Sequence, residues 1–533
     1  MDLVHSPYSL TQPNPMNRKE QLALLKAEKT WDILVIGGGA TGLGVAVDAA
    51  SRGYKVALIE KEDFAKGTSS RSTKLVHGGV RYLAQGNIKL VREALQERGI
   101  LLRNAPHLTR KQAFIVPSYN IVHKYFYGIG LGIYDLLAGK LQIGKVRMLG
   151  KDKVIERMPV VQQKHLIGGV EYYDGQFDDA RLAVSLAQTA VDYGACVVNH
   201  LEVDDLVREG KKISGAVLYD HLSRETFSVS AKVIVNATGV FADGILQMED
   251  KDAHPLLSPS QGIHLVVDKH FFPGNVALMI PKTDDNRVLF AVPWHDKVVL
   301  GTTDTPVDEV NEEPKALDEE IDFVLTHFSR YTTSTLTRKD VRSVFAGLRP
   351  LVRSSNAQNT ALISRDHTIV VAPSGLITII GGKWTTYRKM AKDAVDNAAF
   401  VAKLAKRECV TEDLRIHGWR DMKDAEEALA VYGADAIQIR KLMEEQPAWA
   451  APIHPRSTFT MAEVVWAVRQ EMAMTVEDVL ARRVRLLFLD AKAALEAAPA
   501  IAVVMAAELG FSDAWIAEQK DAFTELASGY ILE

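Results

Sequence analysis

The feature that most constrains this chain is a group of glycines placed between a predicted strand and a predicted helix. Residues 31–36 (WDILVI) form a short apolar run rich in β-branched residues, and the helical pattern ATGLGVAVDAASRG follows from residue 40. Gly37, Gly39 and Gly42 fit the pattern G-x-G-x-x-G at this junction. A strand, a tight glycine turn and a helix in this order predict the first part of a dinucleotide-binding βαβ unit.

Each glycine in this turn has a physical purpose. Gly37 permits the tight turn, Gly39 allows a pyrophosphate to approach the backbone, and Gly42 allows the helix to pack closely on the strand. The backbone N–H groups that open the helix, those of Ala40 and Thr41, then point at the phosphates with the help of the helix dipole. We therefore expect this turn to bind the pyrophosphate of a dinucleotide.

The residues after the turn select the dinucleotide. Glu60 ends a second buried strand, residues 54–60, where a carboxylate accepts hydrogen bonds from ribose hydroxyls and disfavours the 2′-phosphate of NADP. The chain then enters a polar loop, residues 61–83, in place of the further strand–helix units of a typical NAD dehydrogenase. Such a loop suits the second phosphate and the ribitol of FAD. The residues predicted to contact FAD here are Thr68, Ser69, Ser70, Arg71, Ser72 and Lys74, together with Gly239 after a returning strand at 231–237.

Composition bounds the size and class of the protein. With 533 residues, 47% of them hydrophobic, the chain is expected to form about two to four domains. Lysine and arginine total 63 against 67 aspartate and glutamate, and this net charge of −4 gives no field that would attract nucleic acid. Cys196 and Cys409 lack a C-x-x-C partner, so we expect no zinc or other metal site. Few cysteines and no secretory signal in residues 1–30 predict an intracellular protein.

The most apolar later segment is residues 125–139, YFYGIGLGIYDLLAG, between Lys124 and Lys140. It contains Asp135 and is shorter than the roughly 18 to 20 residues that a membrane span requires, so we predict no transmembrane helix. Two interpretations stay open for this segment. One is a buried core helix, which we favour, and the other is a helix that lies at a membrane interface.

Several motifs taken together resemble one family. In combination, and above all through SSRSTKLVHGGVRYL with GGKWTTYR, they are similar to the FAD-dependent, aerobic-type glycerol-3-phosphate dehydrogenases. The resemblance implies oxidation of sn-glycerol 3-phosphate to dihydroxyacetone phosphate, with FAD as cofactor and a membrane quinone as electron acceptor. It also implies peripheral contact with the inner, cytoplasmic face of the membrane, and it allows a homodimer. The motifs are GGGATGLG (37–44), GTSSRSTKLVHGGVRYL (67–83), EYYDGQFDDARL (171–182), NATGVFAD (236–243), GTTDTP (301–306), AGLRPL (346–351), SRDH (364–367) and GGKWTTYRKMA (381–391).

The element pattern and the resemblance predict a discontinuous α/β fold with an α+β part. We expect an N-terminal extension with an amphipathic helix at 1–30, an FAD-dependent oxidoreductase domain at 31–400, and an all-helical domain at 401–533. The middle domain combines a Rossmann-like FAD-binding part, of the glutathione-reductase-like or amino-acid-oxidase-like type, with an inserted antiparallel sheet for the substrate. Predicted strands of that sheet are residues 266–267, 288–292 and 298–302. The basic and apolar RRVRLLFL at 482–489 is expected to pack on the flavin domain.

The resemblance also assigns the substrate residues, and their chemistry agrees with it. A phosphate dianion needs guanidinium and ammonium groups, because arginine binds phosphate oxygens in pairs. For Asp304, orienting a cation and capping a turn stay equal alternatives. Lys383 is expected at the cofactor as well, with Gly382 and Thr385 of the same motif. The implied substrate set is Arg81, Tyr82, His264, Asp304, Arg349, Arg365 and Lys383, of which His264, Arg349 and Lys383 are the catalytic candidates.

Removal of the substrate hydroxyl proton calls for a general base, and histidine is the natural choice. His264 begins an apolar strand, where the family pattern places a histidine that faces the substrate. Flavin reduction should then rise with pH near the ordinary histidine pKa of about 6.5, unless a neighbouring arginine cluster lowers that pKa. His77 is a second candidate that is better suited to contact the cofactor. Two other functions stay open: an oxidase of the same family that reduces O₂ to peroxide, and a non-redox FAD- or nucleotide-binding protein.

Overall fold

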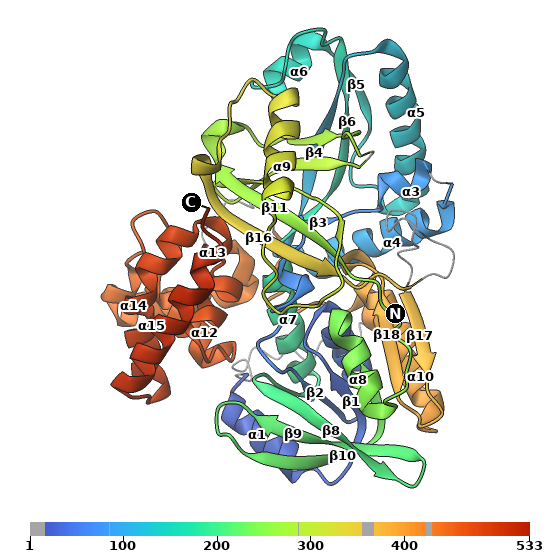
Figure 1. Cartoon of the computed structure of the whole chain (residues 1–533), viewed down its shortest axis with the longest axis vertical. Coiled ribbons are helices and arrows are strands. Elements are labelled where there is room, and N and C mark those ends of the chain that lie inside the picture. The colour runs from blue at the N-terminus through green and yellow to red at the C-terminus, as the bar shows by residue number, and fades with distance from the viewer. Residues whose placement is uncertain (1–15, 85, 286, 354–366, 423–428, 533) are drawn as a thin grey trace.

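The computed structural model describes residues 16–84, 86–285, 287–353, 367–422 and 429–532. Its strands form two sheets that follow one another along the long axis of the molecule, and the C-terminal helices lie at one side of them (Figure 1). The first sheet carries the glycine turn, and the second carries His264 on β11 and Arg349 on β16. The site is therefore built where the two sheets meet.

The first sheet confirms the predicted Rossmann-like part. Its central strands are parallel, and the returning strand predicted at 231–237 pairs with the first strand of the chain, Trp31 opposite Ala231. The strand order is β17 (His367–Val371), β18 (Ile377–Gly381), β10 (Thr226–Asn236), β1 (Trp31–Ile36), β2 (Val56–Ile59) and β7 (Cys196–Val198). In addition, β9 (Lys212–Asp220) pairs antiparallel with β10, and β8 (Leu201–Glu209) pairs antiparallel with β9. Its helices are α1 (Arg18–Ala27), α2 (Ala40–Ser51), α7 (Asp179–Asp192), α8 (Ala242–Glu249) and α10 (Tyr387–Val401).

The second sheet confirms the predicted inserted antiparallel part. The strands expected around residues 266, 290 and 300 pair side by side, with His264 opposite Gly301 and Phe290 opposite Gly301. The order is β15 (Thr305–Pro306), β11 (Ser260–Asp268), β14 (Lys297–Gly301), β13 (Leu289–Trp294), β12 (Ala277–Ile280), β4 (Thr109–Ser118), β6 (Gly168–Phe177) and β3 (Leu75–Val76), with β16 (Val341–Arg349) on β11 and β5 (Arg147–Gly150) on β6. Its helices are α3 (Val80–Ala84), α4 (Ile88–Asn104), α5 (Ile121–Leu137), α6 (Lys151–Arg157) and α9 (Asp318–Tyr331).

Helix α5 differs from the prediction that we favoured. The apolar segment 125–139 does form a helix, but only Leu131 and Tyr134 of α5 are buried. The large apolar side chains of its outer face are 46–79% exposed, so the interpretation as a buried core helix is wrong for this face. Within the described residues, no helix has the length and apolarity needed to cross a membrane. The exposed set is Ile121, Val122, Tyr125, Phe126, Ile129, Ile133 and Leu136.

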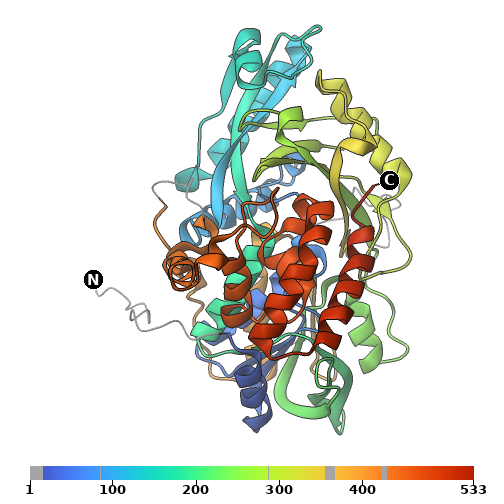
Figure 2. The same ribbon diagram turned by 90° about the vertical axis from the view of Figure 1, so that its left-hand side faces the viewer.

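The C-terminal region is helical, as predicted, but it is not packed separately. Phe488 and neighbouring apolar side chains share one core with Val266, Val299 and Phe345 of the second sheet. Figure 2 shows these helices in front of the rest of the molecule, across its middle. The predicted boundary between the middle domain and the C-terminal domain, at residue 400, stays a prediction. The helices are α11 (Ala436–Glu445), α12 (Met461–Gln470), α13 (Leu486–Leu489), α14 (Ala491–Leu509) and α15 (Asp513–Ser528), with a π-helix at Asp478–Arg483.

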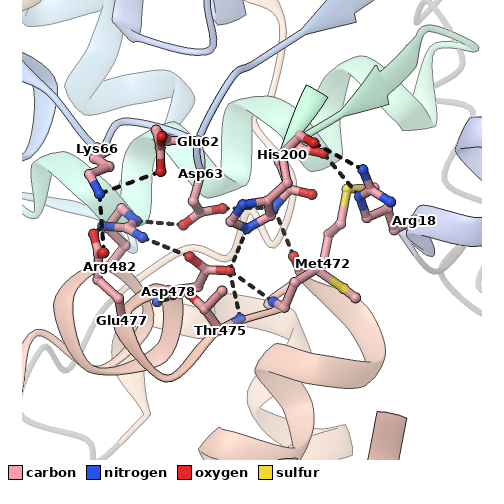
Figure 3. Close-up of polar contacts among 12 residues, drawn as sticks. Arg18, Glu62, Asp63, Lys66, His200, Met472, Thr475, Glu477, Asp478 and Arg482 are labelled. Carbon is pink, nitrogen blue, oxygen red and sulfur yellow. Dashed lines mark hydrogen bonds and ion pairs between the residues drawn. The ribbon is translucent and has the colours of Figure 1, made fainter. Parts of the chain in front are cut away.

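Buried ion pairs join this helical region to the loop that follows β2. Arg482 Nε contacts Asp63 Oδ2 at 2.5 Å, and Arg483 Nη1 contacts the same oxygen at 2.6 Å. Asp478 accepts from Arg482 at 2.7 Å and lies 3.0 Å from His200 Nε2 (Figure 3). All of these side chains are at most 9% exposed. The segment RRVRLLFL therefore packs on the flavin-binding part, as predicted.

Candidate active site

Two adjoining cavities lie where the predicted site residues come together. The first, of about 380 Å³, is lined by the glycine turn and by Glu60 at the end of β2. The second, of about 300 Å³, lies against the second sheet and is lined by His264, Asp304 and Arg349. Thr68 and the segment 381–384 line both cavities. A long ligand in the first cavity would thus reach the residues of the second.

The glycine turn is shaped for a pyrophosphate. Gly37 has φ +106°, and a Cβ there would lie 2.7 Å from the carbonyl oxygen of Ala237. A Cβ at Gly42 would lie only 1.9 Å from the carbonyl oxygen of Gly37, so α2 packs on β1 as closely as glycine allows. Ala40 and Thr41, at the start of α2, line the cavity. Open backbone and the positive end of a helix dipole are what a phosphate requires.

Glu60 lines the same cavity. Its Oε2 accepts from the N–H of Gly38 at 2.6 Å, and its Oε1 accepts from the N–H of Glu62 at 2.8 Å. Burial raises the pKa of the Glu60 carboxyl, while these two N–H groups oppose that shift. The carboxyl is therefore fixed at the position where it can accept from ribose hydroxyls.

The loop after Glu60 divides into two groups of residues. Thr68, Ser69, Arg71 and Ser72 line the cavities, as do Gly239, Gly382 and Thr385 from other motifs. Ser70 and Lys74 line neither cavity. Lys74 is fully buried, and its Nζ contacts Asp179 at 2.7 Å and the carbonyl of Ser70 at 2.6 Å. The structure thus gives these two residues a role in holding the loop, which sequence reasoning did not assign.

His264 lies on β11 at the wall of the second cavity and is 3% exposed. Its Nε2 is 2.8 Å from Thr73 Oγ1, and its ring stacks on Phe345 with centroids 5.0 Å apart. Nδ1 is buried without a hydrogen-bond partner among the described residues. Burial, with the charges of Lys74 and Arg349, holds the pKa of His264 well below its ordinary value. The ring is therefore neutral at physiological pH and has a nitrogen that can accept a proton.

Arg349, at the end of β16, is fixed by acceptors on β11 and on the segment after β14. Its Nη1 donates to the carbonyl of Gln261 at 3.1 Å and to Asp304 at 3.2 Å, while Nη2 donates to the carbonyl of Thr303 at 2.8 Å. Asp304 also accepts from the hydroxyl of Ser260. Of the two alternatives for Asp304, the structure supports the one in which it orients a cation.

The remaining predicted substrate residues have different outcomes. Tyr82 and Lys383 come together at the second cavity, where Lys383 Nζ lies 4.1 Å from the centre of the Tyr82 ring. Arg81 belongs to α3, but its side chain lies outside the described residues, as does the whole of Arg365. His77 lines the second cavity, and its backbone is bonded to Thr385 Oγ1.

Sequence reasoning missed several residues that line the second cavity. Arg287 adds a cation from the segment before β13, and Asp174 adds a buried carboxylate from β6. Trp384 also lines the cavity, and its indole N–H donates to the carbonyl of Ser69 at 2.8 Å. Asp174 and Trp384 stand within the quoted motifs EYYDGQFDDARL and GGKWTTYRKMA, so membership in those motifs was a usable signal. Arg287 stands in no motif, and no local pattern could have assigned it.

Comparisons with known proteins agree with this geometry. A family model described as FAD dependent oxidoreductase matches residues 32–388, and one described as the C-terminal domain of alpha-glycerophosphate oxidase matches residues 376–516. The chain is similar to the mitochondrial glycerol-3-phosphate dehydrogenase of Mus musculus, with 39% identity over 95% of this chain and 74% of that protein.

Two solved structures are also similar. One is the glycerol-3-phosphate dehydrogenase of Bacillus halodurans complexed with FAD, with a TM-score of 0.80 and 30% identity over 97% of this chain and 98% of that one. The other is the L-alpha-glycerophosphate oxidase of Mycoplasma pneumoniae with FAD bound, with a TM-score of 0.55 and 20% identity over 73% of this chain and 99% of that one. At that identity the oxidase shows a shared fold alone.

The glycine turn gives the first testable prediction. Gly42→Ala places a methyl group against the Gly37 carbonyl, so the helix must move off the strand, and the purified protein should retain less than about a tenth of the wild-type FAD. Alanine is otherwise the better helix former by about 1 kcal/mol, so helix propensity cannot explain a loss. Flavin absorbance relative to protein absorbance measures the content. Gly132→Ala on α5, where a Cβ meets nothing within 4 Å, is the matched control. Equal FAD content in the two variants would contradict the assignment.

Proposed function

Since the chain belongs to the family of FAD-dependent glycerol-3-phosphate dehydrogenases, we propose that it oxidises sn-glycerol 3-phosphate to dihydroxyacetone phosphate and delivers the electrons to a membrane quinone. FAD is its cofactor. The observation that carries the proposal is the meeting of two cavities, one built for a dinucleotide and one lined by cations beside a neutral, buried histidine. A small phosphorylated alcohol matches the second cavity in charge.

The cations supply the recognition of the phosphate. Arg349 is held rigidly, so little rotamer entropy is lost when it binds an anion. Lys383 and Arg287 line the same cavity and add positive charge. Arg81 and Arg365 belong to this proposal through the family resemblance. A cluster of this kind binds a dianion far better than it binds an uncharged polyol.

The proposed chemistry divides between the cofactor and the chain. FAD, when bound, supplies the acceptor for the hydride that leaves carbon-2 of the substrate. His264 takes the hydroxyl proton, because its ring is neutral and lines the second cavity. Thr73 and the stacked Phe345 fix the ring plane. Arg349 and Lys383 orient the substrate against the base.

The exposed face of α5 supports delivery of electrons at a membrane. Its apolar side chains are continued by Met148 of β5, which is 43% exposed and lies beside Gly128. Exposed basic residues follow α5 in the sequence, and such residues suit contact with anionic lipid headgroups. The inner face of α5 packs through Leu131 on Phe114, Tyr172 and Met279, which line the second cavity. These basic residues are Lys140, Lys145, Arg147, Lys151 and Lys153.

This face fits peripheral contact with the cytoplasmic side of the membrane, which stays part of the proposal. A second candidate acceptor is O₂, because the glycerophosphate oxidase of Mycoplasma pneumoniae shares the fold. The α5 face favours the quinone, since dissolved oxygen needs no apolar surface to reach a flavin.

The role of His264 is tested by anaerobic stopped-flow reduction of the flavin. His264→Ala should slow flavin reduction by about 10²- to 10⁴-fold, the usual value of a positioned base, with FAD content unchanged. Because burial and two cations lower its pKa, the wild-type rate should rise with pH only well below 6.5 and stay flat above it. A bound substrate dianion would raise the pKa of His264, so the rise in rate would occur at a higher pH. His254→Ala, at an exposed loop position, is the control. Agreement of the His264 variant with wild type within about threefold would remove this residue as the base.

The acceptor and the docking face are tested together with vesicles that contain anionic lipid and a long-chain quinone. Wild-type enzyme with glycerol 3-phosphate should reduce the vesicle quinone and release little peroxide in air. Ile129→Asp, at a position 65% exposed on α5, should lose at least about tenfold of this rate, because burying a charge at the interface is costly. The same variant should keep its full rate with a water-soluble dye.

The matched control is Val503→Asp, which makes the same change at a position 55% exposed on α14, on the far side of the molecule from α5 (Figure 1). It should behave as wild type in both assays. Peroxide released in equal amount to oxidised substrate would identify an oxidase. An unchanged vesicle rate for Ile129→Asp would place the membrane contact elsewhere.

A further inference from the structure

Tyr134 joins the surface helix α5 to the wall of the substrate cavity. Its side chain lies on the inner face of α5 and is 2% exposed. The hydroxyl accepts from the N–H of Gly78 at 2.7 Å and donates to Asp174 Oδ2 at 2.7 Å. Asp174 lines the second cavity, and so do both neighbours of Gly78 in sequence. One hydroxyl on α5 therefore holds two separate parts of the cavity wall.

The segment 77–79 is held by two side chains from distant parts of the chain. Thr385 Oγ1 accepts from the N–H of His77 at 3.2 Å and donates to the carbonyl of His77 at 3.3 Å. Tyr134 holds the next N–H, that of Gly78. The carbonyl of Gly79 then accepts from the N–H of Tyr82 at 2.9 Å as α3 begins. The position of Tyr82 in the cavity thus depends on the hydrogen bonds that Thr385 and Tyr134 make to this segment.

Because the residues here are closely packed, the position of segment 77–79 also affects the position of Tyr82 relative to Lys383. A Cβ at Gly78 would lie 2.7 Å from both Leu95 and Tyr134 Oη, so the backbone has no room to shift in that direction. Gly79 has φ +79°, and a Cβ there would lie 2.5 Å from the Tyr82 ring and 3.4 Å from Lys383 Nζ. A displacement of the segment must therefore move Tyr82 relative to Lys383.

A buried ion pair fixes the direction of the Tyr134 hydroxyl. Asp174 Oδ1 accepts from Arg98 Nη1 at 2.8 Å, and both residues are 2% exposed. A carboxylate paired in this way only accepts, so the hydroxyl proton of Tyr134 points to Asp174 and its lone pairs face the N–H of Gly78. The arrangement is a chain of hydrogen bonds from Arg98 through Asp174 and Tyr134 to the backbone of the cavity wall.

We propose that Tyr134 is a positioning residue for substrate binding: through Gly78 it sets the place of Tyr82 against Lys383 at the phosphate end of the cavity. This inference rests on the proposed function, because it takes Tyr82 and Lys383 as substrate contacts. It assigns an active-site role to a residue of α5 whose hydroxyl touches neither substrate nor cofactor. Phenylalanine at this position keeps the ring and its packing but leaves Gly78 N–H and Asp174 without their partner.

The test compares Tyr134→Phe with wild type as FAD-loaded enzyme in two measurements. First, the glycerol 3-phosphate concentration that gives half-maximal anaerobic flavin reduction should rise about fivefold to a hundredfold, the effect of losing one buried hydrogen-bond partner, with FAD content unchanged. Second, the amide hydrogen of Gly78 should exchange at least about tenfold faster with solvent, because its acceptor is gone. The limiting reduction rate at saturating substrate should change less than the half-saturating concentration.

Tyr127→Phe is the matched control, because Tyr127 lies two turns earlier on the same helix and packs through its ring on His123 and Phe126. It should match wild type in both measurements. Unchanged half-saturation in Tyr134→Phe would overturn the positioning role, and so would rapid exchange of the Gly78 amide in the wild-type enzyme itself. A wild-type enzyme whose flavin is not reduced by glycerol 3-phosphate would instead reject the proposed function, and the exchange measurement would still decide whether Tyr134 holds the segment.

Discussion

Buried ion pairs fix the loop that follows β2 against the C-terminal helices and α7. Asp63 and Asp179 are both 0% exposed. A buried carboxylate left alone costs several kcal/mol, so each must find cations nearby. Asp63 pairs with Arg482 and Arg483, and Asp179 pairs with Lys74 and Arg485. The loop can take its place at the cofactor only when the C-terminal helices are docked against it.

This constraint explains how one loop serves both cavities. The loop is held at Asp63 and again at Lys74, which pairs with Asp179. Between these two points Thr68 and Ser69 line the dinucleotide cavity, and Thr73 contacts His264. The charge of Lys74, close to His264, also contributes to the low pKa of that histidine. The C-terminal helices carry no residue of either cavity lining, yet their ion pairs hold the loop that lines the first cavity and contacts His264. Under the proposed function, these helices contribute by holding other residues in place.

Local signals in the sequence predicted the parts of the structure that depend on local geometry. The turn at Gly37, the strand at 31–36 and the returning strand at 231–237 each follow from periodicity or from a glycine that admits no Cβ. His264 and Arg349 were assigned through motifs, and the structure brings them to one cavity. The paired antiparallel strands at 288–292 and 298–302 were also predicted from short apolar runs alone.

Long-range pairings could not be predicted in this way. Arg482 and Asp63 are 419 positions apart, and no period in the sequence connects them. For the same reason Lys74 was assigned to the cofactor, when a buried carboxylate on α7 holds it. The exposure of α5 was misjudged because an apolar helix has the same composition in a core and at a membrane surface. Only the tertiary arrangement shows that Phe126 and Ile129 face outward.

Anaerobic addition of sn-glycerol 3-phosphate to the purified, FAD-loaded protein, followed by flavin absorbance, tests the proposed reaction directly. The flavin should bleach with formation of about one dihydroxyacetone phosphate per flavin, since the two-electron oxidation of one substrate reduces one FAD. Glycerol without the phosphate should bleach the flavin poorly, because the cation-lined cavity then has no anion to bind. A flavin that stays oxidised with glycerol 3-phosphate, in protein shown to bind FAD fully, would show that this chain does not catalyse the proposed reaction.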